Sequence, residues 1–367
     1  MRFINQILEK ISFWYKKYDR PLSSLSLIGG FVFDALTLKR VDSLWENFWV
    51  AGHLFIVAVT IILLNLDEEK RNNGEGEAEG HFWLVNILQF FFGGLLSTYI
   101  VFYFRSSTLT NTWPFILILI IAFIANERLK KHYERLVFQT SLFFLSLFAF
   151  SIFAVPVFLH QIGSKIFVLS GVISMLVMFL FLLILRYVSK TSFIKERVRL
   201  RSVIWGIFIV FNVLYFTNLI PPLPLSLKTS GVYHSIVKDA QGNYEVSYED
   251  YGWKGFFYMY DDFHLDNANN PVYVYSAVFS PSNLDIQIIH NWEHYDETSK
   301  AWVSMNKVYL PVVGGRAEGF RTYSLGSGLD AGKWRVDVET ENGNIIGRIN
   351  FNLVYNSTAT LSKKINY

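Results

Sequence analysis

Polar and ionisable side chains interrupt several long apolar stretches in the first 220 residues. Asp34 lies late in the first stretch, Gln89 near the start of the third, Arg105 at its end and Glu127 at the end of the fourth. An ionisable group at membrane depth is costly, which makes these residues candidates for a transport or lipid-headgroup site. Structural pairing and snorkelling at helix ends explain the same residues without a ligand. Asp34, Gln89, Arg105 and Glu127 therefore form a first hypothetical binding set.

A second group of candidates lies in the last third of the chain. His290, Trp292 and His294 alternate along one predicted strand, so their side chains share a face. Two histidines at this spacing could chelate a metal ion together with a third ligand. Ile286 and Ile288 precede them on the same face, however, and that pattern fits a hydrogen-bonded histidine in the core. We favour the core interpretation for His290 and predict no metal site.

Arginine and tryptophan residues complete this second group. Arg321 and Arg335 could pair with carboxylates of the sheet such as Asp337, or they could hold an anionic ligand. Residues 253–260 add an aromatic run that could stack on a glycan. The second hypothetical binding set is His290, Trp292, Arg321 and Trp334.

Composition limits the classes of function. The 367-residue chain has no cysteine, which excludes disulfides, thiolate metal ligands and a cysteine nucleophile. Residues 222–367 hold 12 Lys and Arg against 16 Asp and Glu, and an acidic module argues against nucleic acid as a partner. The sequence contains no G-x-S-x-G, no P-loop and no H-E-x-x-H motif. We predict no cofactor, and an enzymatic role is the less favoured alternative.

The elements that must hold the first set are predicted membrane helices. Hydrophobic residues make up 52% of the chain and charged residues 17%, a balance typical of a protein that lies partly in a membrane. Seven apolar stretches precede residue 221, most of them near the ~20 residues that cross a bilayer. They cover residues 22–38, 44–66, 82–104, 112–126, 136–159, 165–187 and 202–220. The first and fourth are short, so we expect about seven spans, with six as the alternative count.

Basic residues predict the orientation of this helical bundle, residues 21–220. With a cytoplasmic N-terminus, seventeen Lys and Arg fall in segments on the cytoplasmic side and four in the outer loops. This bias follows the positive-inside rule and puts the C-terminal module outside the cytoplasm. Residues 1–20 carry apolar groups at helical spacing but are too polar to span, which predicts an amphipathic helix at the membrane surface. Packing of that helix against the bundle is the alternative.

The second set requires a β module. Pro221, Pro222 and Pro224 end the last helix, and residues 221–231 are predicted to form a Pro-rich linker. Strands with a period of two are then predicted at 232–238, 243–249, 255–260, 272–280, 284–294, 301–311, 320–325, 332–340 and 344–353. Short strands separated by turns favour an antiparallel, Ig-like β-sandwich over residues 232–367. Asn342-Gly343 predicts a tight primed turn in the last hairpin.

The middle of this module, residues 284–354, resembles a known family. It contains H-x-W at His290 and Trp292, then LPVVGG and GFRTYS, then GKWRVDV and IGRINF. Together these motifs resemble a bacterial family known as domain of unknown function 2914. The helical segments SLIGGFVFDALTL and QFFFGGLLSTYIVFYFRSS look like membrane halves joined to that domain. The resemblance implies a fold and carries over no catalytic residue.

These patterns predict a multi-pass protein of the bacterial inner (cytoplasmic) membrane. Its expected function is non-enzymatic, namely to present an extracytoplasmic β-sandwich to a partner protein or an envelope glycan. The alternative is a membrane transporter or a lipid- or glycolipid-modifying enzyme whose site uses Asp34, Gln89, Arg105 and Glu127. The lipid bilayer is the one partner that the composition itself implies.

Overall fold

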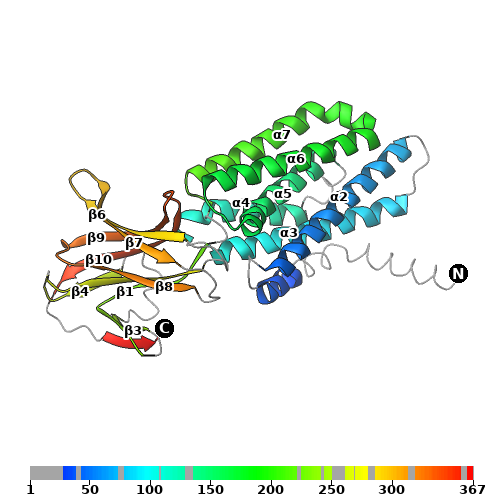
Figure 1. Ribbon diagram of the computed structural model, residues 1–367. Helices are drawn as coiled ribbons and strands as arrows, with labels where there is room; N and C mark the ends of the chain where they lie inside the picture. The colour runs from blue at the N-terminus through cyan, green and yellow to red at the C-terminus, as the bar shows by residue number, and fades with distance from the viewer. Residues whose placement is uncertain are drawn as a thin grey trace. The chain divides into compact units, whose positions relative to one another are not determined.

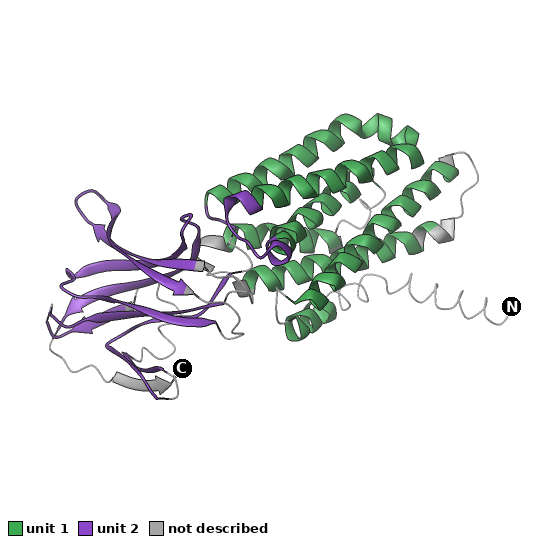
Figure 2. Cartoon of the chain, in the orientation of Figure 1, with its two compact units in different colours: residues 1–104, 113–155, 167–217 green, residues 105–112, 156–166, 218–367 purple. Residues whose placement is uncertain are grey.

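The computed structural model describes most of the chain. The described residues are 28–38, 43–72, 78–106, 109–128, 135–220, 225–240, 244–249, 261–267, 269–279, 286–312, 319–356 and 362–366. The predicted surface helix at 1–20, the prolines of the linker and the aromatic strand at 255–260 lie outside them. The chain forms two compact units (Figure 2), a helical unit of residues 1–104, 113–155 and 167–217 and a β unit of 105–112, 156–166 and 218–367.

Helices make up the described N-terminal part, as the apolar stretches predicted. They are Ile28–Thr37, α2 (Leu44–Asn72), α3 (Ala78–Ser106), α4 (Leu109–Arg128), α5 (Leu136–Leu159), α6 (Ser164–Val188) and α7 (Lys190–Phe216). Within the described residues, five of them (α2, α3, α5, α6 and α7) are long and apolar enough to cross a membrane. Ile28–Thr37 and the apolar part of α4, Trp113–Asn126, are shorter. A multi-pass membrane part is therefore confirmed at this level.

Two helices extend beyond the apolar stretches that the sequence predicted for them, 44–66 and 202–220. The acidic end of α2 is helical to Asn72, and its carboxylates bind other helices: Asp67 lies 3.1 Å from His81 Nδ1 of α3, and Glu69 accepts from Thr191 of α7 (2.8 Å). The basic segment from Lys190 forms the first three turns of α7. Hydrogen bonds between helix ends therefore stabilise helical residues outside the apolar stretches.

Aromatic side chains fill the interior of the helical unit. Phe148 of α5 stacks on Phe208 and Phe211 of α7, with ring centroids 5.6 and 4.8 Å apart, and Phe167 of α6 stacks on Tyr215 at 3.7 Å. The apolar window of α5 is 78% buried, whereas those of α6 and α7 are 33% and 22% buried. Helix α5 is thus central, and α6 and α7 keep apolar outer faces suited to lipid contact.

Three sheets form the β unit (Figure 1). Their strands are β1 (Ser226–Tyr233), β2 (Ser235–Lys238), β3 (Tyr244–Glu249), β4 (Asp261–Leu265), β5 (Val272–Phe279), β6 (Ile286–Asp296), β7 (Ala301–Val312), β8 (Phe320–Gly326), β9 (Gly332–Thr340), β10 (Ile345–Tyr355) and β11 (Ser362–Asn366). The sheet orders are β1-β5-β8, β4-β10-β9-β6-β7 and β11-β3-β2. The predicted strands are confirmed closely from β5 to β10, where period-two alternation is strongest.

One apolar core joins the first two sheets. Val274 of β5, Ile288 and Trp292 of β6, Val336 of β9 and Phe351 of β10 belong to a single buried cluster. Residues of β6, β9 and β10 reach it at every second position, so one face of the five-stranded sheet is buried, as the alternation predicted. A second cluster packs the small sheet against the outer face of β5. Two sheets therefore face each other across the main core, and the third covers part of one outer face.

The structure corrects three sequence-based expectations of the β unit. Strand β4 pairs in parallel with β10, so the sheets are not wholly antiparallel; alternation predicts a strand but carries no information on its direction. Strand β1 begins at Ser226, inside the predicted linker. In the last hairpin Gly343 (φ +77°) donates to Thr340 O at 2.9 Å, while Asn342 has no positive φ. That turn is a longer loop ending in a left-handed glycine, not a primed two-residue turn.

Candidate functional site

Gln89, from the first hypothetical binding set, lies at a contact between two helices. Gln89 of α3 and Asn126 of α4 are both buried, and each side-chain amide donates to the other's backbone carbonyl, at 3.4 and 3.2 Å. A similar contact joins α2 to α5, where Asn65 Nδ2 donates to Gln139 Oε1 at 2.7 Å. Such reciprocal amide contacts fasten helices in an apolar surrounding. The geometry around Gln89 is therefore that of a helix–helix contact.

Asp34 occupies a second, separate polar location. Its buried carboxyl lies near Ser97 of α3 and His53 of α2. His53 Nδ1 contacts the carbonyl of Trp49 at 2.9 Å, and its ring packs on Gly94, where an added Cβ would lie 3.4 Å from the ring. Gly94 thus leaves room for the His53 ring next to a carboxylate.

The remaining two residues of the first set lie at helix ends. Arg105 is near the end of α3 and Glu127 near the end of α4, and their side chains lie outside the described part of the chain. Along α3, the ~1.5 Å rise per residue puts Gln89 about 12 Å from Ser97 and Arg105 about 12 Å further on. Gln89, Ser97 (which lies beside Asp34) and Arg105 are therefore spread along the length of α3.

In the β unit, His290 is the centre of a buried hydrogen-bond network. Its Nε2 lies 2.8 Å from Ser276 Oγ of β5 and its Nδ1 2.8 Å from Ser324 Oγ of β8. Trp292 Nε1 donates to the same Ser324 oxygen at 3.0 Å. His290 and Trp292 belong to β6, so this network, the histidine clasp, joins the two facing sheets.

The histidine clasp contains a serine hydroxyl and an imidazole, the groups of a nucleophile and a base, but both are closed off from solvent. A neutral ring with its proton on Nε2 satisfies every group: Trp292 donates to Ser324, Ser324 donates to Nδ1, and Nε2 donates to Ser276. Burial lowers the pKa of His290 to about 4. His290 is fully buried and both serines nearly so, so no substrate reaches either hydroxyl. The clasp is a structural cross-link, as the core interpretation of His290 predicted.

The opposite face of the five-stranded sheet carries a row of paired charges. Arg335 of β9 binds Glu293 of β6, and its guanidinium carbon lies 4.4 Å from the Trp302 ring centroid of β7. Arg348 of β10 binds both oxygens of Asp337, at 2.5 and 2.6 Å. We call this row the charged sheet face. The sequence left open whether Arg335 pairs with a carboxylate of the sheet or holds an anionic ligand, and the structure shows a pair within the sheet.

A third carboxylate on this face belongs to Glu339 of β9. It forms no ion pair with an arginine among the residues that the structure describes. Asn291 Nδ2 donates to Glu339 Oε1 and to Glu293 Oε1, both at 3.0 Å. Burial raises the pKa of Glu339, and the neighbouring Asp337 carboxylate raises it further, against the opposing Asn291 hydrogen bond. One oxygen each of Glu293, Asp337 and Glu339 lies within 4.8 Å of the others. Because arginines bind two of the three carboxylates, the group is largely neutralised from within the sheet.

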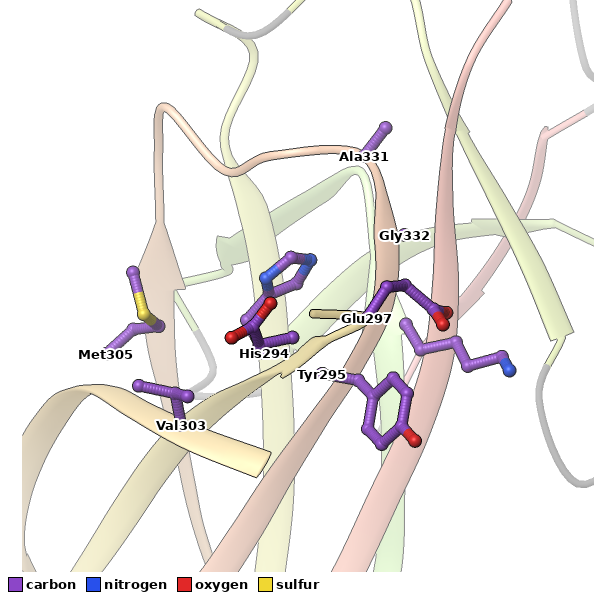
Figure 3. Close-up of a pocket in the computed structure, with 9 residues that line it drawn as sticks. His294, Tyr295, Glu297, Val303, Met305, Ala331 and Gly332 are labelled. Atoms are coloured by element: carbon purple, nitrogen blue, oxygen red, sulfur yellow. The ribbon is translucent and has the colours of Figure 1, made fainter. Parts of the chain in front are cut away.

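A hollow opens where β6, β7 and β9 come together (Figure 3). It has a volume of about 420 Å³ and is lined by His294, Tyr295, Val303, Met305 and Lys333 among others. Gly332 (φ +124°) belongs to this wall, and an added Cβ would lie 3.2 Å from His294 Nε2. Asp296 is on the rim, and hydrogen bonds from Ser299 and from the Thr298 backbone lower its pKa.

The other members of the second set occupy distinct places. Trp334 is buried, donates from Nε1 to Asp330 O at 2.8 Å, and packs against the tilted ring of His294 with ring centroids 4.7 Å apart. Arg321 of β8 lies opposite Ala277 of β5, one residue out of phase with the core-facing Phe320. His290, Trp292 and Trp334 are therefore brought together in the core, while Arg321 belongs to the other sheet's outer face.

Sequence reasoning missed one buried acidic residue. Glu249 of β3 binds His234 Nε2 and His264 Nδ1, each at 2.9 Å, and also accepts the His264 backbone N–H at 2.8 Å. Its side chain is 1% exposed. Strand β3 belongs to the small sheet and His264 to β4 of the large one, so the carboxylate ties these two sheets together. No spacing in the sequence signals this contact, because its partners are His234, in the bend between β1 and β2, and His264 on β4.

Acid should weaken the histidine clasp in a defined pH window. The folded pKa of His290 (about 4) is below the ordinary 6.5, so the unfolded chain binds the proton first. The free energy of unfolding should fall as pH drops from 6.5 to 4, by at most about 3 kcal/mol from this residue. Hydrogen exchange of β6 amides in the intact protein, corrected for intrinsic rates, would measure the loss. His290→Gln should remove this part of the pH dependence; an unchanged slope would contradict the assignment.

The charged sheet face gives an opposite pH effect through Glu339. Its folded pKa is raised, so the folded state holds the proton more tightly and stability falls as pH rises above the ordinary value of 4.5. Glu339→Gln keeps an acceptor for Asn291 and removes the buried charge. At pH 7 the variant should exchange β9 amides more slowly than wild type, with the difference vanishing below pH 4.5. Glu297→Gln, on the exposed turn after β6, is the control and should change nothing.

The histidine clasp, the charged sheet face and most of the hollow's wall fall within one continuous part of the chain. No curated protein and no solved structure matches the chain. The resemblance inferred from its motifs is confirmed, because residues 285–353 match the model of the family described as "Protein of unknown function (DUF2914)".

Proposed function

We propose that this chain is an anchored adaptor of the bacterial envelope. In this proposal the helical unit holds it in the cytoplasmic membrane with seven crossings, and the β unit, an Ig-like sandwich on the outer side, recruits a partner protein. The partner adds an extended strand to the free edge of β7. Of the protein and glycan partners that the sequence left open, this choice follows from the backbone chemistry of that edge.

The exposed edge of β7 carries the proposal. Strand β7 ends the order β4-β10-β9-β6-β7, so β6 is its one hydrogen-bonded neighbour among the described strands. It is 12 residues long and mostly exposed, and it displays the apolar side chains of Val303, Met305 and Tyr309. An edge strand turns alternate N–H and C=O groups outward, and an extended polypeptide is the ligand that satisfies them in series.

The edge is also protected against pairing with copies of itself. The register of β6 and β7 shifts between Trp292 and Glu293 and leaves Met305 without a direct partner, which is a bulge. Lys307 and Pro311 follow on the same strand. Bulges, lysines and prolines are the devices by which edge strands avoid indiscriminate association. The edge is therefore selective, which suits one specific partner strand.

The hollow next to β7 could hold a side chain of the partner strand. Val303 and Met305 of β7 line both the strand edge and the hollow, together with His294 and the start of β9 at Gly332 (Figure 3). In strand addition, main-chain hydrogen bonds supply affinity and pockets for alternate side chains supply specificity. An apolar side chain of the partner strand would rest on Val303 and Met305, under the negative rim of Asp296.

Orientation is supported by the basic residues. Lys190, Lys195, Arg197, Arg199 and Arg201 gather in the first half of α7, whose second half is apolar to Phe216. The positive-inside rule assigns such a cluster to the cytoplasmic side. One crossing by α7 then leads to an extracytoplasmic β unit.

The cysteine-free chain makes this orientation directly measurable. Single cysteines at Glu341, on the exposed β9–β10 turn, and at Lys190 should react with a membrane-impermeant maleimide on opposite sides. In spheroplasts Glu341→Cys should be labelled at once and Lys190→Cys only after lysis. The reverse pattern would refute an extracytoplasmic β unit, and labelling of both would refute an odd number of crossings between the two sites.

Strand addition is tested by photo-crosslinking in the intact membrane. A photoreactive phenylalanine analogue at Tyr309 of β7 should trap one discrete partner, whereas the same group at Leu325, exposed on β8, should not. Met305→Pro removes a backbone N–H at a bulge, where proline is tolerated, and should abolish the adduct; Met305→Ala keeps that N–H and should retain most of it. Amides of β7 should gain protection from hydrogen exchange in the trapped complex. Adducts at Leu325, unprotected β7 amides, or only dimers of this chain would contradict the proposal.

A further inference from the structure

A cavity lies at one end of the helical unit, between the end of α2 and the first turns of α5 and α7. Its volume is about 700 Å³, within the ~300–1,000 Å³ typical of ligand pockets. Ser192, Lys195, Glu196 and Arg199 line it from one face of α7 at helical spacing, and Arg135 faces it from the start of α5. We call it the basic-end cavity.

The positive charges of this cavity are only partly neutralised by the protein. Glu196 binds Arg199, with Oε2 3.3 Å from Nη1, so these two charges offset each other. Arg135 and Lys195 have no ion pair among the residues that the structure describes, although Glu68 of α2 also contributes to the wall. The first turn of α5 carries no acidic residue, so its partial positive charge adds to theirs. An anion with several acceptor oxygens fits this arrangement.

The depth of the basic-end cavity is that of lipid headgroups. From Leu136 to Leu159, α5 contains no charged residue, and α7 contains none from Ser202 to Phe216. Hydrocarbon therefore begins just beyond Arg135 on one helix and Arg201 on the other. At the same end, α6 finishes with exposed Arg186 and Tyr187, residue types that favour the membrane–water boundary.

We propose that the basic-end cavity binds a phosphate group, with Arg135 and Lys195 as its cationic ligands and the Ser192 hydroxyl as a further donor. Arginine and lysine make charge-assisted bonds to phosphate oxygens, and basic pockets between membrane helices select anionic headgroups. The same chemistry serves an anionic phospholipid in the surrounding leaflet or a free phosphate from solution. This site is independent of the β7 edge and of whichever partner that edge recruits.

The test compares how tightly the intact protein binds an anionic lipid and a lipid without net charge. Purified full-length protein in detergent is titrated with phosphatidylglycerol or with phosphatidylcholine, and bound lipid is counted by native mass spectrometry. Phosphatidylglycerol should bind more tightly, and Arg135→Gln with Lys195→Gln should weaken it on the order of tenfold. Lys190→Gln with Arg197→Gln removes the same charge from exposed positions outside the cavity and should leave binding close to wild type.

Inorganic phosphate distinguishes the two sources. If it displaces phosphatidylglycerol from wild type, the cavity accepts a free phosphate as well; if it does not, the ligand is the lipid, and either result supports the site. Equal binding of the two lipids would overturn it. Equal loss in both double variants would also overturn it, because attraction would then come from the whole basic end rather than from the cavity.

Discussion

The β unit depends on one neutral imidazole held between two sheets. His290 reaches Ser276 and Ser324 on two strands of the opposite sheet, and Trp292 on its own strand shares the second serine. A buried polar network is favourable only when every member is paired, so the clasp fixes the register of both sheets at once. The motif residues His290, Trp292 and Ser324 are thus accounted for by packing and pairing. The β7 edge and the hollow beside it, on which the proposed function rests, are surfaces that the clasp holds in place.

The helical unit follows the same rule in an apolar surrounding. Gln89 with Asn126 and Asn65 with Gln139 fasten helix pairs, and Tyr103 of α3 donates to the Ala149 carbonyl of α5 at 3.0 Å. Buried polar groups in a membrane part need such partners. The contrast is with the basic-end cavity, where Arg135 and Lys195 line open space and have no ion pair among the residues that the structure describes. Several polar groups inside the helical unit are thus paired across helices, whereas these two cations face a cavity.

Sequence patterns predicted most elements and few of the contacts between them. Apolar length found the helices, and period-two alternation found β5 to β10, because both depend on neighbours within one segment. The direction of β4 and the partners of Glu249 depend on residues far apart in the chain, so no local pattern encodes them. His290 was assigned to the core from Ile286 and Ile288, but its serine partners could not be read from spacing. The exposure of β7 also required the strand order, since an edge strand and an inner strand can share one sequence pattern.

The histidine clasp has a consequence for how such sequences change over evolutionary time. Losing one partner leaves a buried donor or acceptor unsatisfied, whereas replacing the whole set by apolar groups of similar shape is nearly neutral. We therefore expect Ser276, His290 and Ser324 to be kept or replaced together, although 14 and 34 residues separate the serines from the histidine. Ser276 precedes the segment that matches the family model, which starts at residue 285. The structural unit that the clasp holds together is thus longer than the segment that the family model matches.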